Sequence, residues 1–203
     1  MSDVLTGLHH SLVFNRRTRV LAEAITPLLP AGRVLDVGCG DGTIDALIMR
    51  QAKADGRKVE ITGIDVMVRP VTHIPVRPYD GRTLPAADGG ADAVLFVDVL
   101  HHTDDALVLL KEAARVAPAV IIKDHFLEGL AAGPTLRFMD WVGNAGHGVV
   151  LPYNYWTRAQ WLAGFAAAGL KIDTLIEKIP LYPFPASLLF SRGLHFIARL
   201  TRA

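Results

Sequence analysis

The stretch RVLDVGCGDGTIDAL, residues 33–47, places three alternating glycines and two acids within the seven residues 36–42. Its first part is a short, β-branched run bounded by glycine, which predicts a buried strand, and its last part predicts a helix. Glycine lets a ligand approach the main chain without a Cβ in the way, and the helix that follows presents free N–H groups. The stretch therefore predicts a strand–turn–helix unit whose turn binds a large polar ligand.

The charge of this turn favours one kind of ligand over another. The dinucleotide fingerprint is G-x-G-x-x-G with a pyrophosphate at the helix N-terminus. Here the spacing is G-x-G-x-G, Asp41 stands between the second and third glycines, and Asp36 lies near the strand end. Carboxylates repel a pyrophosphate and attract an ammonium or sulfonium group. The turn therefore favours a positively charged cofactor that carries an amino acid over NAD.

Strand and helix patterns alternate along the chain. Predicted strands lie at residues 33–38, 59–66, 73–81, 91–100, 119–126, 170–179 and 193–200. Predicted helices lie at residues 16–29, 43–54, 104–117 and 157–169, with Asp104 or Asp105 opening the third and Gln160 at capping-box distance from Thr157. This order predicts an α/β fold, a doubly wound, mostly parallel seven-stranded sheet with helices on both faces. The last two strands have no helix between them, so we expect an antiparallel C-terminal edge strand.

Composition narrows the class of protein. The 203 residues are 51% apolar and 20% charged, which fits a single folded domain over residues 1–203. The net charge of +1 and the lack of a basic cluster argue against nucleic acid as a partner. A single cysteine, Cys39, excludes an internal disulfide and a multi-cysteine metal site, and we expect no bound metal. No transmembrane or signal segment is evident, so we expect a cytoplasmic protein.

Two further acids follow predicted strands. Asp65 ends the second strand, where an acid can accept hydrogen bonds from both hydroxyls of a ribose. The alternative is that Asp65 caps the next turn. Asp80, followed by Gly81, ends the third strand, where an acid can accept from the exocyclic amine of adenine. The alternative for this pair is an ordinary Asp-Gly turn.

Four stretches together resemble a known family. VLDVGCGDG (34–42), ITGIDV (61–66), YDG (79–81) and VLFVDVLHHTDD (94–105) are similar to the class I S-adenosylmethionine-dependent methyltransferases, in the small-molecule group called type 11. The resemblance covers roughly residues 15–126. It implies a Rossmann-like methyltransferase fold, S-adenosyl-L-methionine as cofactor, S-adenosyl-L-homocysteine as product and a small molecule as acceptor.

The resemblance also implies which residues contact the cofactor. They are Asp36, Gly38, Gly40 and Asp41 for the methionine part, Asp65 for the ribose, Val66 and Met67 for the flanks of adenine, Asp80 with Gly81 for its amine, Val97 for the ammonium, and Arg17, or else Arg16 or Arg19, for the carboxylate. This chain departs from the family in the link between Asp65 and the third strand, which is too short for the usual helix.

Candidate residues for acting on the acceptor follow the fourth and fifth strands. His101 and His102 follow the fourth strand, and Asp124 and His125 end the fifth. We select His125, His102 and Asp124 as catalytic candidates, because a histidine or an acid can take a proton from an acceptor. The alternative for the His101–His102 pair is helix capping or packing. Neighbours on a strand point to opposite faces, so we do not expect Asp124 and His125 to form a simple pair.

Residues 127–156 have no clear period, and we expect them to be an insertion that covers the acceptor. Trp141, His147, Tyr153 and Tyr155 are its candidate covering residues, whereas we expect Trp156 and Trp161 to pack a helix onto the sheet. The apolar stretch PLYPFPASLLF, residues 180–190, and the mean hydropathy of +0.31 favour a lipophilic acceptor or peripheral contact with a membrane.

Three functions therefore compete. The first is methyl transfer from S-adenosylmethionine to a small-molecule acceptor, with oxygen, nitrogen and carbon all open as the methylated atom. The second is an NAD-type oxidoreductase, against which the charge and spacing of the turn argue. The third is a non-catalytic module that binds S-adenosylmethionine and transfers nothing.

Overall fold

The computed structural model of the protein describes residues 2–144 and 152–203. Its centre is a seven-stranded sheet of order β3-β2-β1-β4-β5-β7-β6. The strands are β1 (Gly32–Val37), β2 (Val59–Asp65), β3 (Val76–Pro78), β4 (Ala93–Val97), β5 (Ala119–His125), β6 (Leu170–Ile176) and β7 (His195–Arg202). The first five strands are parallel, whereas β7 is antiparallel to both β5 and β6. The predicted fold class is confirmed.

The place of the last strand differs in one detail from the prediction. β7 pairs antiparallel as expected, but it lies between β5 and β6, so β6 forms the edge. The physical reason is burial: residues 195–198 of β7 are all buried, whereas most side chains of β6 are exposed. A strand that is apolar on both faces belongs inside a sheet, and a more polar strand suits the edge.

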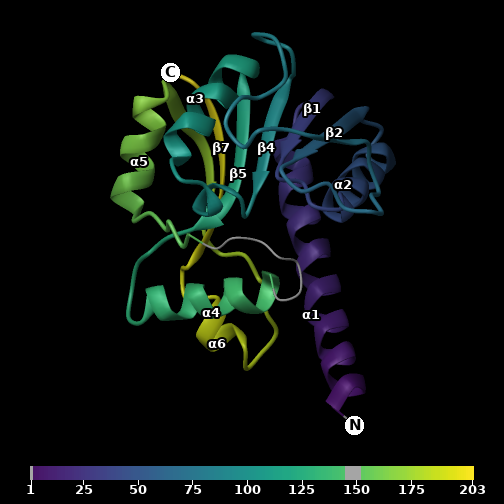
Figure 1. The fold of residues 1–203 in the computed structure, drawn as a ribbon, viewed down its shortest axis with the longest axis vertical. Helices are drawn as coiled ribbons and strands as arrows, with labels where there is room; N and C mark the ends of the chain where they lie inside the picture. Colours follow the sequence, from purple (N-terminus) through teal and green to yellow (C-terminus); the bar gives the residue numbers. More distant parts are fainter. Residues whose placement is uncertain (1, 145–151) are drawn as a thin grey trace.

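Helices cover both faces of the sheet. They are α1 (Ser2–Ile25), α2 (Thr43–Ala54), α3 (Ala106–Val116), α4 (Ala132–Asn144), α5 (Arg158–Ala167) and α6 (Ser187–Phe190), with short 3₁₀ turns η1 (Thr26–Leu28) and η2 (Leu100–His102). Figure 1 shows α1 and α2 on one side of the sheet and α3 and α5 on the other. Neighbouring residues of β4 enter different cores: Leu95 packs with the α1–α2 core and Phe96 with the α3–α5 core.

Side-chain caps fix the start of two helices. Asp105 is the N-cap of α3 and accepts a hydrogen bond from the Leu107 N–H at 2.9 Å. Thr157 and Gln160 form a full capping box at the start of α5. Both signals were predicted from the sequence. By contrast, α1 begins at Ser2 rather than at residue 16, and the predicted apolar stripe lies in its C-terminal part, where Leu21 and Ile25 join the core.

The insertion contains a helix that the sequence did not predict. α4 occupies residues 132–144 and, with α6, lies beyond the ends of the strands (Figure 1). Leu136 and Asp140 are buried, whereas Phe138 and Trp141 are exposed. Because apolar residues lie on both sides of α4, its sequence does not show the apolar spacing that is typical of an amphipathic helix. Residues 145–151, which include His147, lie outside the described part of the chain. Residues 66–75 contain no helix, as the short link predicted.

Among the described helices, none combines the length and the apolar character that crossing a membrane would require.

Candidate functional site

The three glycines of the β1–α2 turn all adopt positive φ, but they have different physical roles. A Cβ on Gly38 would lie 2.6 Å from a methyl carbon of Val99, and one on Gly42 would lie 2.4 Å from Ile74 Cγ1. These two glycines are therefore required by packing as well as by backbone conformation. A Cβ on Gly40 would meet no described atom within 4 Å. Gly40 is thus the position at which the turn leaves bare, accessible main chain for a ligand.

Two buried carboxyl groups lie beneath this turn. Asp36 is the residue before the last of β1 and is 3% exposed, and Asp45 lies in the first turn of α2 and is 1% exposed. The two groups are close enough for each to shift the pKa of the other. Asp36 Oδ1 and both oxygens of Asp45 have no donor among the described residues. Burial and then the neighbouring charge of Asp45 raise the pKa of Asp36 well above its usual range, and burial raises the pKa of Asp45 to about 6.

Sequence reasoning identified Asp36 but missed Asp45. An acid in the first turn of a helix is common, because it complements the helix dipole, so its position alone does not single it out. Buried carboxyls without donors, next to bare main chain, fit a ligand that brings positive charge.

Asp65 ties the turn to the end of β2. One carboxylate oxygen accepts from the Gly40 N–H at 2.9 Å, and the other accepts from the Met67 N–H at 2.8 Å. The side chains of Val66 and Met67 are exposed just beyond the strand. Each oxygen of Asp65 retains further acceptor capacity, so contact with a ribose remains a prediction that the geometry permits.

Asp80 and Asp41 organise local turns. Asp80 Oδ1 accepts from the N–H groups of Thr83 and Arg82, and these bonds lower the pKa of Asp80. This is the Asp-Gly turn considered as the alternative above, with Gly81 at φ +80°. Asp41 Oδ1 accepts from the Thr43 N–H at the start of α2. Their contacts with a cofactor remain predictions.

A cavity of about 860 Å³ joins the turn to an apolar wall. On one side it is lined by Asp36, Gly38, Cys39 and Asp45, and on the other by side chains of α4 and of residues 182–190. Of the residues predicted from sequence, the cavity brings together Arg17, Asp36, Gly38, Val97, His102 and His125. Gly40, Asp41, Asp65, Val66, Met67, Asp80, Gly81 and Asp124 lie outside its lining.

A buried lysine, which was not among the residues predicted from sequence, lines this cavity. Lys123 is 0% exposed, and its Nζ contacts Asp98 Oδ1 and lies 3.4 Å from His125 Nε2 and 3.3 Å from His195 Nδ1. Its position within the apolar strand pattern AVIIKDHF gave no signal that its side chain reaches the site. Burial lowers the pKa of Lys123, and the facing Asp98 opposes this shift.

Arg17 also pairs with Asp98 rather than standing free. Burial raises the pKa of Asp98, but the charges of Lys123 and Arg17 outweigh burial and hold that pKa well below its usual range. Asp98 has φ +57°, a left-handed conformation that is uncommon outside glycine. The two cations therefore hold a strained residue at the end of β4, and contact of Arg17 with a cofactor carboxylate remains a prediction.

His101 is the centre of a second buried cluster. Its Nδ1 lies 2.7 Å from Asp124 Oδ1 and its Nε2 lies 3.3 Å from Asp140 Oδ2, while Tyr155 donates its hydroxyl to Asp140. Burial opposes the charged form of His101, but Asp124 and then Asp140 raise its pKa to about 10. His101 is therefore an imidazolium at neutral pH, and the predicted candidate Asp124 serves mainly as its counterion.

The two remaining histidine candidates both line the cavity and are neutral. Burial and then the charge of His101 lower the pKa of His102 to about 4. Burial and then Lys123 lower the pKa of His125. When the Lys123 ammonium donates a hydrogen bond to His125 Nε2, the lone pair of Nε2 accepts it. The proton of the neutral His125 ring then lies on Nδ1. His102 is the candidate whose nitrogens are not held in this way.

Two sets of donors, His101–His102–Asp140 and His101–Asp124–His125, are close enough together to suggest a metal. Each set includes His101, whose two nitrogens also face the carboxylates of Asp124 and Asp140.

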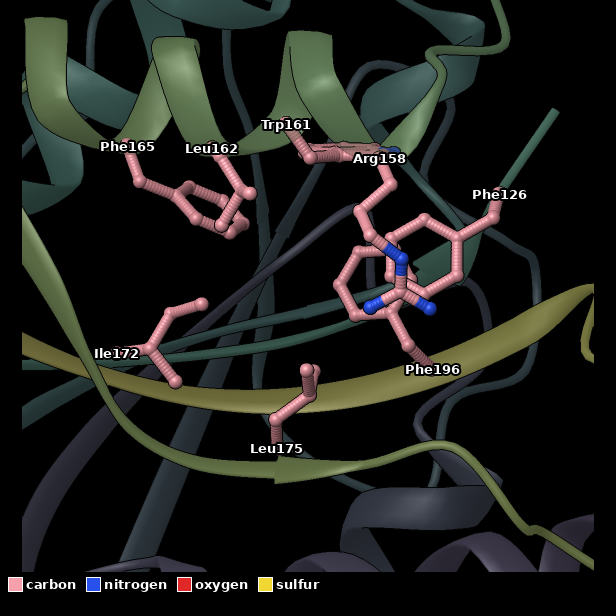
Figure 2. A pocket seen from close by; sticks show the side chains of 8 residues that line it. All are labelled: Phe126, Arg158, Trp161, Leu162, Phe165, Ile172, Leu175 and Phe196. Carbon is pink, nitrogen blue, oxygen red and sulfur yellow. The ribbon is translucent and has the colours of Figure 1, made fainter. Parts of the chain in front are cut away.

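A second, much smaller cavity of about 10 Å³ lies between α5 and the β6–β7 pair. Figure 2 shows the Arg158 side chain beside the ring of Phe126, with its guanidinium carbon 4.3 Å from the ring centre. A space of this size holds about one water molecule. Trp161 is buried in this core, and Trp156 packs against Gly164, so both tryptophans pack the helix onto the sheet as predicted.

Comparisons with known proteins agree with this arrangement. A family model described as a methyltransferase domain matches residues 12–175. The 27-O-demethylrifamycin SV methyltransferase of Amycolatopsis mediterranei is 32% identical over 138 residues, which are 56% of this chain and 49% of that protein. This chain therefore spans about half the length of that relative. An O-methyltransferase of Aspergillus nomiae is 27% identical over 164 residues, 66% of this chain and 70% of that protein.

A solved structure supports the fold. The structure of a methyltransferase from Thermotoga maritima superimposes with a TM-score of 0.64 at 18% identity, covering 98% of this chain and 96% of that chain.

Proposed function

Because this chain belongs to the methyltransferase-domain family, we propose that it transfers a methyl group from S-adenosylmethionine to a hydroxyl group of a small lipophilic molecule. The single observation that carries the proposal is the cavity of about 860 Å³ that joins the acidic glycine turn to an apolar wall. Family membership also argues against the nicotinamide-dependent alternative.

Several residues of the turn would hold the cofactor. Asp36 and Asp45 offer buried negative charge, Gly40 offers bare main chain, and Asp65 and Val97 stand at the ends of β2 and β4. S-adenosylmethionine, when bound, supplies an electrophilic methyl group. The carboxylates attract positive charge, and the rigid strand ends orient the bound molecule toward the rest of the cavity.

The apolar wall would hold the acceptor. It is formed by Phe138, Met139 and Val142 of α4 and by Pro183, Phe184 and Phe190 of the 180–190 stretch. Apolar side chains exclude water from a reacting centre and favour an apolar ligand. Two relatives that methylate oxygen by name lead us to propose a hydroxyl as the reacting group.

His102 is the residue that we propose as the proton acceptor. It lines the cavity and stays neutral because burial and the nearby imidazolium of His101 disfavour its charged form; the two ring centres are 4.0 Å apart. Its pKa of about 4 makes it a weak base, which suits an acceptor whose hydroxyl is already acidic. His125 and Lys123 would position the acceptor, with Asp124 holding His101 in place.

Transfer of label separates the outcomes. The purified protein is incubated with methyl-labelled S-adenosylmethionine and with either lipid-soluble or water-soluble cell extracts, and parallel reactions contain excess S-adenosylhomocysteine as the control. We expect labelling of the lipid-soluble fraction that the control abolishes. Labelling confined to the water-soluble fraction would overturn the lipophilic acceptor. Cofactor binding without labelling of either fraction would favour the non-catalytic module.

A further inference from the structure

Asp45 was not singled out by the sequence, yet it is among the most buried acids of the described residues. It is 1% exposed, lines the cavity, and has no donor for either oxygen among the described residues. Its carboxyl group lies next to that of Asp36, which has an unpartnered oxygen of its own. A buried polar group without a partner is costly, so its presence here calls for a ligand or a proton.

The described groups whose charges act most strongly on the pair are not cationic. The ionisable groups with the largest effects on it are Asp41 in the turn and Asp65 at the end of β2, and Cys39 faces the same acids. All of these are acidic groups. Two adjacent carboxylates in such a place cannot both ionise cheaply, because each charge opposes the other and neither is solvated.

We propose that Asp36 and Asp45 share one proton in the cofactor-free protein and release it when the positively charged end of S-adenosylmethionine or S-adenosylhomocysteine binds. The inference rests on the proposed cofactor site and deepens it. The O–H bond of the shared proton breaks, the proton passes to the solvent, and both carboxylates become ionised beside the ligand's ammonium group. Asp45 is thus a second residue that recognises the cofactor by charge.

The sign of the pH dependence follows from this linkage. In the free protein the pKa of Asp45 is raised to about 6 and that of Asp36 is also raised well above its usual range, so the pair holds a proton at low pH. The cofactor binds the fully ionised pair. Affinity therefore rises with pH and falls as the pH drops below the raised values.

Calorimetry counts the released proton directly. S-adenosylhomocysteine is titrated into the full chain at about pH 6, in several buffers that differ in ionisation enthalpy, and the slope of the observed heat gives the protons released. We expect a release of about one proton for the wild type. Asp45→Asn should release close to none, because an amide mimics the protonated acid and can donate to Asp36. Its folding is checked by thermal unfolding, and Asp36→Asn gives an independent second test.

Asp55→Asn is the matched control, since Asp55 is an exposed acid at the other end of α2 and should behave as the wild type. At about pH 8 we expect Asp45→Asn to bind S-adenosylhomocysteine about tenfold more weakly than the wild type does. At low pH we expect the difference in affinity between the two proteins to be smaller. Binding with no buffer-dependent heat in the wild type would overturn the shared proton while leaving the proposed function intact. An absence of binding in every buffer would overturn both.

Discussion

Single residues around the β1–α2 turn have separable physical roles. Gly38 and Gly42 are fixed by their contacts with Val99 and Ile74, whereas Gly40 leaves open main chain. The glycine motif could be predicted to bind a ligand from its sequence, but it could not be resolved into these roles, because each depends on a side chain distant in sequence. Lys123 escaped prediction for the same reason, since its partner Asp98 comes from another strand.

The His101 cluster gives the stability of the protein a defined pH dependence. The folded-state pKa of His101 is about 10, against an ordinary value of 6.5, so its contribution is complete below 6.5 and is lost as the pH rises through 10. Replacing His101 with Gln removes the positive charge that faces Asp124 and Asp140. We expect this variant to lose about 3–5 kcal/mol of unfolding free energy near neutral pH.

Urea unfolding between about pH 6 and about pH 10 measures this effect. The difference between wild type and His101→Gln should shrink as the pH rises, and His73→Gln, a change at an exposed histidine, should track the wild type. A constant difference across this range would show that His101 is not the charged partner.

At the scale of elements, the alternation of strands and helices was readable from sequence because each buried strand is a compact apolar run between turn residues. The capping signals at Asp105 and Thr157 located two helix starts. α4 was not predicted, because some of its apolar side chains are buried in the protein interior and others line the cavity. Its apolar residues therefore do not form a single stripe. The position of β7 was also not predictable, because local sequence does not show which strands pair.

α4 supplies a test of the acceptor wall. Phe138 lines the cavity, whereas Trp141, one turn along and 62% exposed, lies outside its lining. We expect Phe138→Ser to lower methyl transfer to the lipid-soluble fraction by about tenfold, since losing part of an apolar contact costs about 1.4 kcal/mol. The affinity for S-adenosylhomocysteine should not change.

Trp141→Ser is the matched control on the same helix, and it should retain both activity and affinity. Equal losses of transfer in the two variants would contradict a specific role for the cavity-facing side of α4.

For the whole molecule, the parallel strands bring their carboxyl ends to one edge of the sheet, and α4 and α6 lie beyond that edge (Figure 1). Apolar side chains of α4 and of the 180–190 stretch line the cavity there. Ligands of open α/β sheets bind at this edge, so the general location of the site follows from topology. The two sides of the cavity differ in chemistry. Acidic groups surround the β1–α2 turn on one side, and apolar side chains form the wall on the other side. This difference is what matches a cationic cofactor on one side and a lipophilic acceptor on the other.

The measurement that tests this account most directly is calorimetric titration of the protein with S-adenosylmethionine, S-adenosylhomocysteine and NADH. We expect the first two to bind at one site per chain and NADH not to bind. Asp65→Ala should weaken S-adenosylhomocysteine about tenfold or more, because Asp65 anchors both the turn and the end of β2, while Glu60→Ala, an exposed change on the same strand, should not. Binding of NADH without S-adenosylmethionine, or unchanged affinity in Asp65→Ala, would contradict the account.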